Sequence, residues 1–520
     1  MIHQKTLTAI TITLAISCLI AIASPERAQA DWNTGVGRTA TRTSLAPDVG
    51  PTGADQIWHG SRPSLVAQQG CAAGDLLVLN RIQSFTIPTG DWIVAHDLAT
   101  GAERWVVQLP FANPDEWRSR VTAIRDGHVY ATRSGGAANP GYLYALNPVD
   151  GSILWRSIDR IQESTTESAA FAPNGDLIIG NFTELLRINK DTGATVWRAA
   201  RSNPTDDGGS AVVFGTRVYI WEASGSGPKV TAFDLGTGAR LYSSAALSPG
   251  LIQQIGLMVG PDGTIYAPRS MNNPATDYFV ALTDTGASFV EKWRYPMGYT
   301  PFASFGVGPD GTVYTYSRAN EVVRLDPATG SVLNTSAPIP FDFPMMPRIG
   351  IDTDGKIYLT NGGFTHGALL AFNADLSPRW SVSISGVNLG GPLIGQGGIL
   401  VVCGTGNDVR AFRSTNPVGI ADLFPDGRAL VLEQNAPNPF TGLTTIGFAL
   451  PRASTLSLAI YDAAGALVRT LASGNEQPAG AGRVTWDGRD DRGRRAPAGI
   501  YFYRLDAAGE NRTRRMLLQK

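Results

Sequence analysis

The sequence predicts an all-β protein, an eight-bladed β-propeller followed by a small β-sandwich. A β-rich unit recurs from about Asp55 to Arg413, its turn glycines are spaced like those of propeller blades, and the strand pattern changes from about residue 430. The composition agrees with this prediction, because 59 Gly and 33 Pro in 520 residues suit many short strands joined by tight turns.

The recurring unit has two parts. An Asp-Gly or Asn-Gly turn leads into a β-rich run, as in Asp262–Tyr266, and two strands joined by a Thr-Gly-type turn follow, as in Leu186–Trp197. These short alternating runs lack the 3.6-residue apolar spacing of helices, which excludes a helical solenoid. The turn glycines are 50, 42, 45, 48 and 44 residues apart, close to the period of propeller blades; they are Gly101, Gly151, Gly193, Gly238, Gly286 and Gly330.

The end of the repeat series predicts how the ring closes. Eight β-rich runs indicate eight blades, but the eighth unit stops after Val409–Phe412 and lacks its last strand. Asp55–Trp58, before the first complete unit, aligns with the outer strand Ser152–Trp155. We therefore expect residues 55–58 to complete blade eight and to protect an edge that would otherwise be open.

The remaining segments define the domain organisation. Residues 1–30 read as a secretory signal, with Lys5, an apolar run and a small-residue cleavage site. We expect linkers at 31–54 and 414–430, the propeller at 55–413 and the sandwich at 431–520. No later segment has the roughly 18 consecutive apolar residues of a membrane span. A formal net charge of -1 gives no reason to expect a nucleic-acid partner.

Two cysteines remain after the signal, Cys71 and Cys403. The repeat alignment puts Cys71 before a blade's second strand and Cys403 at the end of such a strand. The two thiols are therefore expected at opposite faces of neighbouring blades, separated by about the length of one strand. A strand of five extended residues spans roughly 17 Å, which is too far for a disulfide. We expect two free thiols.

The strand-turn-strand Leu143–Trp155 resembles the repeats of the pyrroloquinoline-quinone (PQQ)-type propeller family. That family includes quinoprotein alcohol dehydrogenases and non-catalytic members such as the outer-membrane assembly factor BamB. The resemblance implies that recurring tryptophans dock between blades, with Tyr242 and Asn334 replacing them in two blades. The implied docking residues are Trp58, Trp105, Trp155, Trp197, Trp293 and Trp380.

The segment from Leu430 onward contains Asn435–Phe440 and Gly499–Leu505. These motifs resemble the immunoglobulin-like domain of the flagellar hook-cap protein FlgD and the type A C-terminal sorting domains of the type nine secretion system. The resemblance implies a small immunoglobulin-like sandwich that directs passage across the outer membrane, with the secretion machinery as its partner.

Catalytic chemistry has little support in the residues. His3, His59, His96, His128 and His366 lack the spacings of metal sites. Asp352–Gly355 aligns with the blade turns, and Asp487–Asp491 reads as a charged hairpin loop where weak calcium binding stays open. A quinoprotein dehydrogenase would imply a catalytic Asp, calcium ligands and adjacent cysteines, yet no Cys-Cys pair exists and no position matches the others.

These observations favour a non-catalytic, secreted or surface-displayed propeller that binds a protein or glycan through loops on one face. No cofactor is predicted. Two alternatives stay open: an oxidoreductase that depends on PQQ and calcium, and a periplasmic assembly factor like BamB.

Overall fold

The fold was analysed in a computed structural model. It describes residues 44–519 apart from 61, 63–65, 84–89, 112–117, 135–140, 162–168, 181–182, 203–210, 223–226, 248–255, 270–274, 276, 299–302, 340–346, 363–366, 385–389, 405–408, 415–429, 433–434, 436–437, 439, 451–452, 464, 478–479 and 508. The predicted signal at 1–30, His3 and His366 lie outside the described residues.

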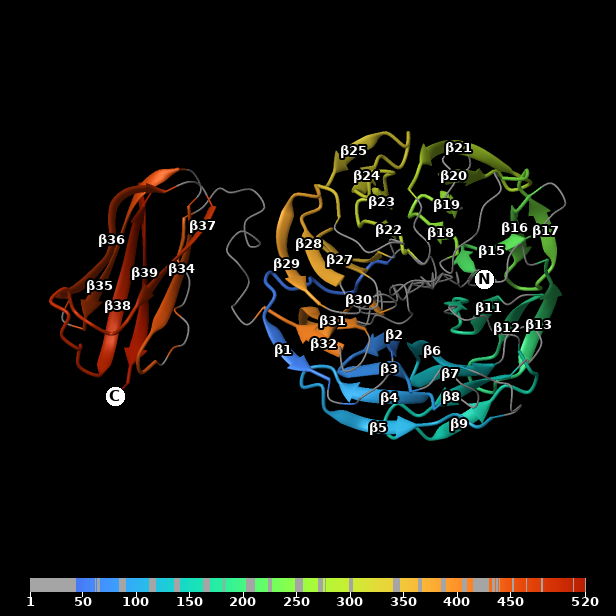
Figure 1. Ribbon diagram of the computed structural model, residues 1–520, viewed down its shortest axis with the longest axis horizontal. Helices are drawn as coiled ribbons and strands as arrows, with labels where there is room; N and C mark the ends of the chain where they lie inside the picture. Colours follow the sequence, from blue (N-terminus) through green and yellow to red (C-terminus); the bar gives the residue numbers. More distant parts are fainter. Residues whose placement is uncertain are drawn as a thin grey trace, which may run out of the picture.

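Eight four-stranded antiparallel sheets form a ring, which confirms the predicted propeller (Figure 1). Blades 1 to 4 contain β2 (Val66–Ala73), β3 (Leu76–Ile82), β4 (Trp92–Asp97) and β5 (Glu103–Val107); β6 (Arg118–Arg125), β7 (His128–Ser134), β8 (Tyr142–Leu146) and β9 (Ile153–Arg156); β10 (Ala170–Phe171), β11 (Leu177–Gly180), β12 (Glu184–Ile188) and β13 (Thr195–Ala200); β14 (Val212–Phe214), β15 (Arg217–Glu222), β16 (Lys229–Asp234) and β17 (Arg240–Ser243).

Blades 5 to 8 continue the same order from the inside of the ring outward. They contain β18 (Met258–Val259), β19 (Ile265–Arg269), β20 (Tyr278–Asp284) and β21 (Phe289–Pro296); β22 (Gly306–Val307), β23 (Val313–Tyr316), β24 (Val322–Leu325) and β25 (Val332–Thr335); β26 (Arg348–Ile351), β27 (Ile357–Gly362), β28 (Gly367–Phe372) and β29 (Pro378–Ser383); β30 (Gly390–Gly395), the 3-10 turn η1 (Gln396–Gly398), β31 (Ile399–Cys403), β32 (Val409–Phe412) and β1 (Gln56–His59).

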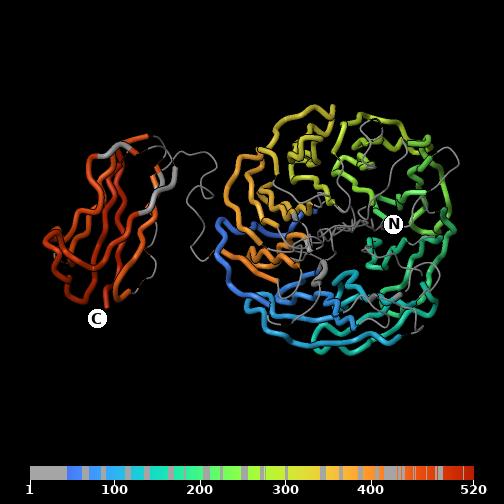
Figure 2. Tube along the Cα trace, in the orientation of Figure 1, coloured from blue at the N-terminus to red at the C-terminus, as the bar shows by residue number. Residues whose placement is uncertain are grey.

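Blade 8 combines the two ends of the propeller sequence. Its sheet order is β1-β32-β31-β30, and β1 pairs antiparallel with β32, with His59 opposite Arg410. The expected closing strand, Asp55–Trp58, overlaps β1. Figure 2 shows the first and last parts of the propeller sequence side by side in this blade.

The connections of each blade separate into two faces, because antiparallel neighbours run in opposite directions. One face, here called the turn face, carries the tight turns between the first and second strands and between the third and fourth strands. The opposite loop face carries longer connections, such as residues 157–169 between β9 and β10 and residues 244–257 between β17 and β18.

Residues 44–53, which we expected to be part of a linker, instead pack against blades 6, 7 and 8. Leu45 forms a parallel bridge with Ile351 of the innermost strand β26, and Ser44 Oγ donates a 2.7 Å hydrogen bond to Phe305 O. Gly50 N donates to Asp352 Oδ2 over 3.0 Å. This segment therefore lies along the inner edge of the ring before the chain enters β1.

The sandwich has two sheets, ordered β33-β34-β37 and β36-β35-β38-β39. Trp486, Tyr503 and Leu458 are fully buried between them. The strands are β33 (Val431–Leu432), β34 (Thr444–Leu450), β35 (Ser454–Asp462), β36 (Leu467–Gln477), β37 (Gly480–Trp486), β38 (Gly499–Ala507) and β39 (Glu510–Leu518).

Candidate functional site

The blade-to-blade seams contain the tryptophans that the sequence singled out. Trp197, on the outer strand of blade 3, lies against Gly238 in the outer turn of blade 4, and a Cβ placed on that glycine would come within 2.6 Å of the indole. Trp197 Nε1 donates a 3.0 Å hydrogen bond to Leu235 O of the same turn. Gly238 has φ +74°, so glycine is required there both by the backbone and by the ring.

The same contact occurs at five of the eight seams. In each of them an indole lies on the next blade's turn glycine, with a hypothetical Cβ 2.5–2.6 Å from the ring. In each the indole N–H donates to a carbonyl of that turn over 2.9–3.0 Å. The pairs are Trp58 with Gly101, Trp105 with Gly151, Trp155 with Gly193, Trp197 with Gly238 and Trp293 with Gly330.

Trp380, the sixth tryptophan, lacks this arrangement. It would meet the outer turn of blade 8, but β32 and β1 are not joined by a turn because they come from opposite ends of the propeller. Its Nε1 has no hydrogen-bond partner in the described part of the chain. The indole instead packs at 5.9 Å from the ring of Tyr358.

Between blades 6 and 7, Asn334 occupies the position that tryptophan has at other seams. Here Tyr314 makes the hydrogen bond to the next blade. The Tyr314 hydroxyl donates a 3.0 Å hydrogen bond to Ala374 O, the turn carbonyl that accepts from an indole elsewhere. The blade 7 turn carries Leu376, buried and at φ +66°, where the Trp seams have glycine. Without an indole above it, this position accommodates a side chain.

Tyr242 occupies the place between blades 4 and 5, where the seam is polar. Its hydroxyl and that of Tyr219 each donate a 2.7 Å hydrogen bond to Asp284, and Arg217 Nη1 donates to the same carboxylate over 2.9 Å. Burial and the hydrogen bond to Asp284 raise the pKa of Tyr242 to about 12, so the hydroxyl stays a donor at neutral pH.

A buried arginine on the innermost strand of blade 7 was not singled out by the sequence. Arg348 begins the innermost strand of blade 7, is 4% exposed, and makes no hydrogen bond or ion pair through Nε among the described residues. Burial lowers its pKa to about 10. Its side-chain stem lies against Gly391 of β30. Sequence reasoning missed this residue, because nothing in the repeat distinguishes it from other arginines.

The described histidines are dispersed. His96 of blade 1 is buried beneath Trp58, with ring centroids 6.4 Å apart, and burial lowers its pKa to about 4. His128 is in blade 2 and His59 in blade 8. Among the described residues, no group of three or more His, Cys, Asp or Glu is placed to hold a metal ion.

Cys71 and Cys403 are free and buried. Burial raises the pKa of Cys403 to about 12 and that of Cys71 further, so both remain thiols at neutral pH. The sequence has no adjacent pair of cysteines, and among the described residues no cluster of acidic or histidine side chains forms a calcium donor set.

The two sequence-predicted acidic turns serve local structure. Asp352 Oδ1 accepts the N–H groups of Asp354 and Lys356 at 3.0 and 2.8 Å, while Oδ2 holds the N-terminal segment. Burial raises the pKa of Asp352 to about 6, against the opposing effect of these backbone hydrogen bonds.

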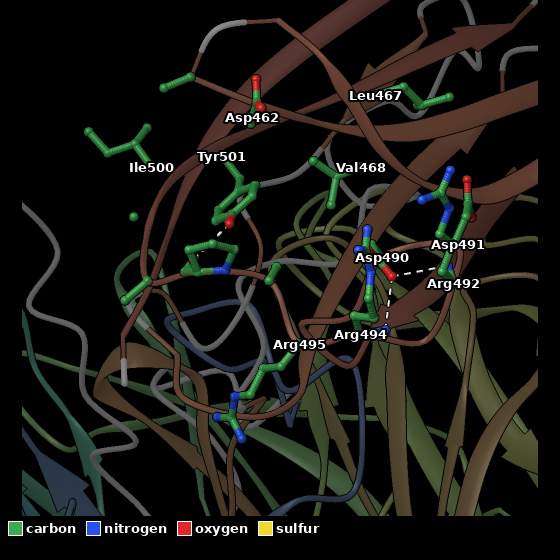
Figure 3. Close-up of a pocket in the computed structure, with 15 residues that line it drawn as sticks. Asp462, Leu467, Val468, Asp490, Asp491, Arg492, Arg494, Arg495, Ile500 and Tyr501 are labelled. Atoms are coloured by element: carbon green, nitrogen blue, oxygen red, sulfur yellow. Dashed lines mark hydrogen bonds and ion pairs between the residues drawn. The ribbon is translucent and has the colours of Figure 1, made fainter.

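In the sandwich, the loop of Asp487–Asp491 borders an open groove of about 1070 Å³ (Figure 3). Asp490 Oδ1 accepts the backbone N–H groups of Arg492 and Arg494 at 3.0 and 2.8 Å, and Oδ2 accepts Arg494 Nε at 2.9 Å. Asp491 Oδ1 accepts Thr470 N over 3.1 Å. These carboxylates are already used to hold the loop.

The geometry defines a class, an eight-bladed propeller with a small β-sandwich after it. The family model described as "Outer membrane protein assembly factor BamB" matches residues 89–245 and again 139–286, and that of the "FlgD Ig-like domain" matches residues 435–511. Residues 89–286 thus match a repeat model of the BamB type, within the propeller, and residues 435–511 match a FlgD immunoglobulin-like domain, within the sandwich. No curated protein matches it significantly.

Several solved structures are similar to this chain. BamB from Moraxella catarrhalis is 18% identical, covers 60% of this chain and 81% of its own, and has a TM-score of 0.38. PorZ, a surface component of the type-IX secretion system of Porphyromonas gingivalis, is 14% identical, with 87% and 69% covered and a TM-score of 0.42. A europium-containing methanol dehydrogenase is 12% identical, with 81% and 90% covered and a TM-score of 0.38.

Within the described ranges, no helix is long and apolar enough to cross a membrane.

Proposed function

We propose that this chain is exported and acts as a non-catalytic binding or scaffold propeller, displayed outside the cell or at its surface. The observation that carries the proposal is that the recurring tryptophans pack between blades. Five indoles lie on a glycine of the next blade and donate to that blade's turn, which makes them rigid parts of the ring. Their contacts support a packing role over stacking beneath a quinone.

The loop face is the proposed binding surface for a protein or glycan. Its longest connections, residues 157–169 and 244–257, have 13 and 14 residues, whereas no turn of the opposite face has more than six. Loops carried on a rigid scaffold are where binding residues concentrate. Changes in the sequence of these loops would thus change the ligand without disturbing the contacts between blades.

The sandwich is the proposed export tag, recognised by the secretion machinery. The match of residues 435–511 to the FlgD Ig-like domain supports this role. Expression with and without residues 431–520 in a bacterium that has a type nine secretion system tests it. We expect the full chain in the medium or at the surface and the shortened chain in the periplasm. Identical distribution of the two would contradict the tag.

A second candidate is a periplasmic assembly factor, favoured by the match of residues 89–286 to the BamB family model. Cell fractionation distinguishes the two candidates. Residence of the full chain in the periplasm of such a bacterium would support the assembly factor and overturn surface display.

Titration with PQQ and calcium tests the absence of catalysis. We expect no change in absorbance of the quinone and no alcohol-dependent dye reduction. Stoichiometric binding accompanied by turnover would overturn the non-catalytic proposal.

A further inference from the structure

The seam between blades 4 and 5 contains a cavity of about 500 Å³ on the turn face, within the usual range of small-ligand sites. It is lined by the inner turns of both blades and by the end of β20. The residues that matter for its chemistry are Phe214, Arg217, Asp262, Asp284 and Lys292. The cavity lies opposite the loop face and is separate from the binding surface proposed above.

This cavity lies where the Trp contact is missing. A Cβ placed on Gly286 would have a single neighbour within 4 Å, Arg217 Nη2 at 3.7 Å, whereas an indole lies 2.5–2.6 Å from the corresponding atom at five other seams. The blade 5 turn is also different, with Thr285 N bonded to Ser288 O. The outer turn of blade 5 therefore does not make the indole contact that the turns at the five Trp seams make, and Asp284 at the start of this turn borders the cavity instead.

Both carboxylates at the cavity already accept several hydrogen bonds from the protein. Asp284 accepts from Tyr242, Tyr219, Arg217 and the Gly286 N–H, at 2.7 to 2.9 Å. Burial opposes ionisation of Asp284, but these hydrogen bonds and the Arg217 charge lower its pKa below the usual range.

Asp262 is occupied in the same way. Its Oδ1 accepts Thr264 N at 3.0 Å, and its Oδ2 accepts Thr264 Oγ1 and Lys292 Nζ at 2.8 and 3.2 Å. Neither acid therefore offers a ligand much capacity to accept hydrogen bonds.

The cations, by contrast, keep donors for a ligand. Arg217 Nη2 reaches only Gly286 O, at 3.5 Å, and the side chain is 31% exposed. Lys292 Nζ donates to Asp262 and Thr264 and has three N–H groups, so one remains; its side chain is 25% exposed. The complementary ligand is rich in acceptors, and a carboxylate makes the strongest hydrogen bonds to such cations.

An aromatic ring lines the same cavity. Phe214 ends β14, is 36% exposed, and lies against the turn at Gly263, where a Cβ would be 3.0 Å from Cε1. The face of an aromatic ring is negative, and the C–H groups of a sugar ring are weakly positive, so the two attract.

We propose that this cavity binds an acidic sugar unit of a saccharide, with its carboxylate on Arg217 and Lys292 and its ring on Phe214. An extended acidic peptide fits less well, because peptides bind sheets through unpaired backbone groups. The strands that end at the cavity, β15 and β20, are paired on both sides.

Calorimetric titration of the exported chain with a trigalacturonate tests the proposal, with neutral galactotriose and a glutamate tripeptide as comparison probes. We expect trigalacturonate to bind at least about tenfold more tightly than either, which corresponds to about 1.4 kcal/mol. Phe214→Ala and Lys292→Gln should each raise the dissociation constant about tenfold or more. Lys190→Gln is the matched control, because Lys190 is 27% exposed, pairs with Asp191 and does not line the cavity.

Thermal unfolding of each variant separates lost binding from lost folding. Absence of trigalacturonate binding by the folded wild-type chain would overturn the proposal, as would binding unaffected by Phe214→Ala and Lys292→Gln. Equal binding of the glutamate tripeptide would replace the saccharide with a peptide. None of these results bears on export or on the loop face, which fractionation tests separately.

Discussion

The contact between one blade's outer strand and the next blade is made in one way at five seams of the propeller and in other ways at the remaining three. At the five, an indole lies on a glycine of the next blade and donates to its turn. At the others, Tyr242 joins a polar cluster, Tyr314 donates the hydrogen bond in place of an indole beside Asn334, and Trp380 finds no turn. The difference shows that indole and glycine act as one unit: where the indole is lost, the turn changes with it.

The largest expected effect is loss of an indole. Trp197→Ala should lower the free energy of unfolding by about 3–5 kcal/mol, the usual cost of truncating a buried aromatic. Asn334→Ala, at the seam without an indole, removes one 3.2 Å hydrogen bond from Arg324 and should cost about 1 kcal/mol. Denaturant midpoints measure both variants. Equal losses would contradict the distinction between the two kinds of seam.

Replacing turn glycines with alanine distinguishes the free-energy cost of a clash with an indole from the cost of backbone strain. Gly127→Ala and Gly286→Ala, at φ +75° and +89°, meet no neighbour closer than 3.7 Å and should cost about 1–2 kcal/mol from strain alone. Gly238→Ala adds a clash with Trp197 and should cost about 1–3 kcal/mol more. Thermal unfolding measures this difference. A Gly238→Ala loss no greater than that of Gly127→Ala would mean that the indole is not tightly held.

Asp352, which binds the N-terminal segment 44–53 through Gly50, should make the free energy of unfolding depend on pH. Its folded pKa of about 6 exceeds the unfolded value of 3.8, so the folded state binds more protons between these values. The free energy of unfolding should therefore fall as pH rises from about 4 to about 6, by at most about 3 kcal/mol, and level off above.

Unfolding measured from pH 4 to pH 7 tests this pH dependence. Asp352→Asn should remove the decline, while Asp354→Asn, in the same turn but 47% exposed, should keep it. A wild-type chain whose stability rises over this range would show that the hydrogen bonds of Asp352 outweigh its burial.

The smallest effect distinguishes two tryptophans. Trp155→Phe removes a 3.0 Å hydrogen bond to Lys190 O, whereas Trp380→Phe removes none that involves the described residues. Because one hydrogen bond contributes about 1 kcal/mol, the first should cost about that much more than the second. Chemical denaturation measures both, and a greater loss at Trp380 would contradict the open seam at blade 8.

The sequence by itself determined the features that are encoded within each repeat. Alternating strands, Gly101 and its equivalents at positive φ, and the blade period are encoded within about 45 residues and predicted the propeller. The sandwich followed from similar strand spacing and from the motifs around Asn435–Phe440.

Tertiary structure alone decided which residues meet. Gly50 and Asp352 are 302 positions apart, and no repeat indicates that residues 44–53 follow the inner edge of the ring. Leu376 at positive φ, the buried Arg348 and the cavity bordered by Asp284 likewise depend on the neighbouring blade. The physical reason is that a periodic sequence specifies the fold of each blade, whereas seams and cavities arise from contacts between blades, where single departures from the repeat set the chemistry.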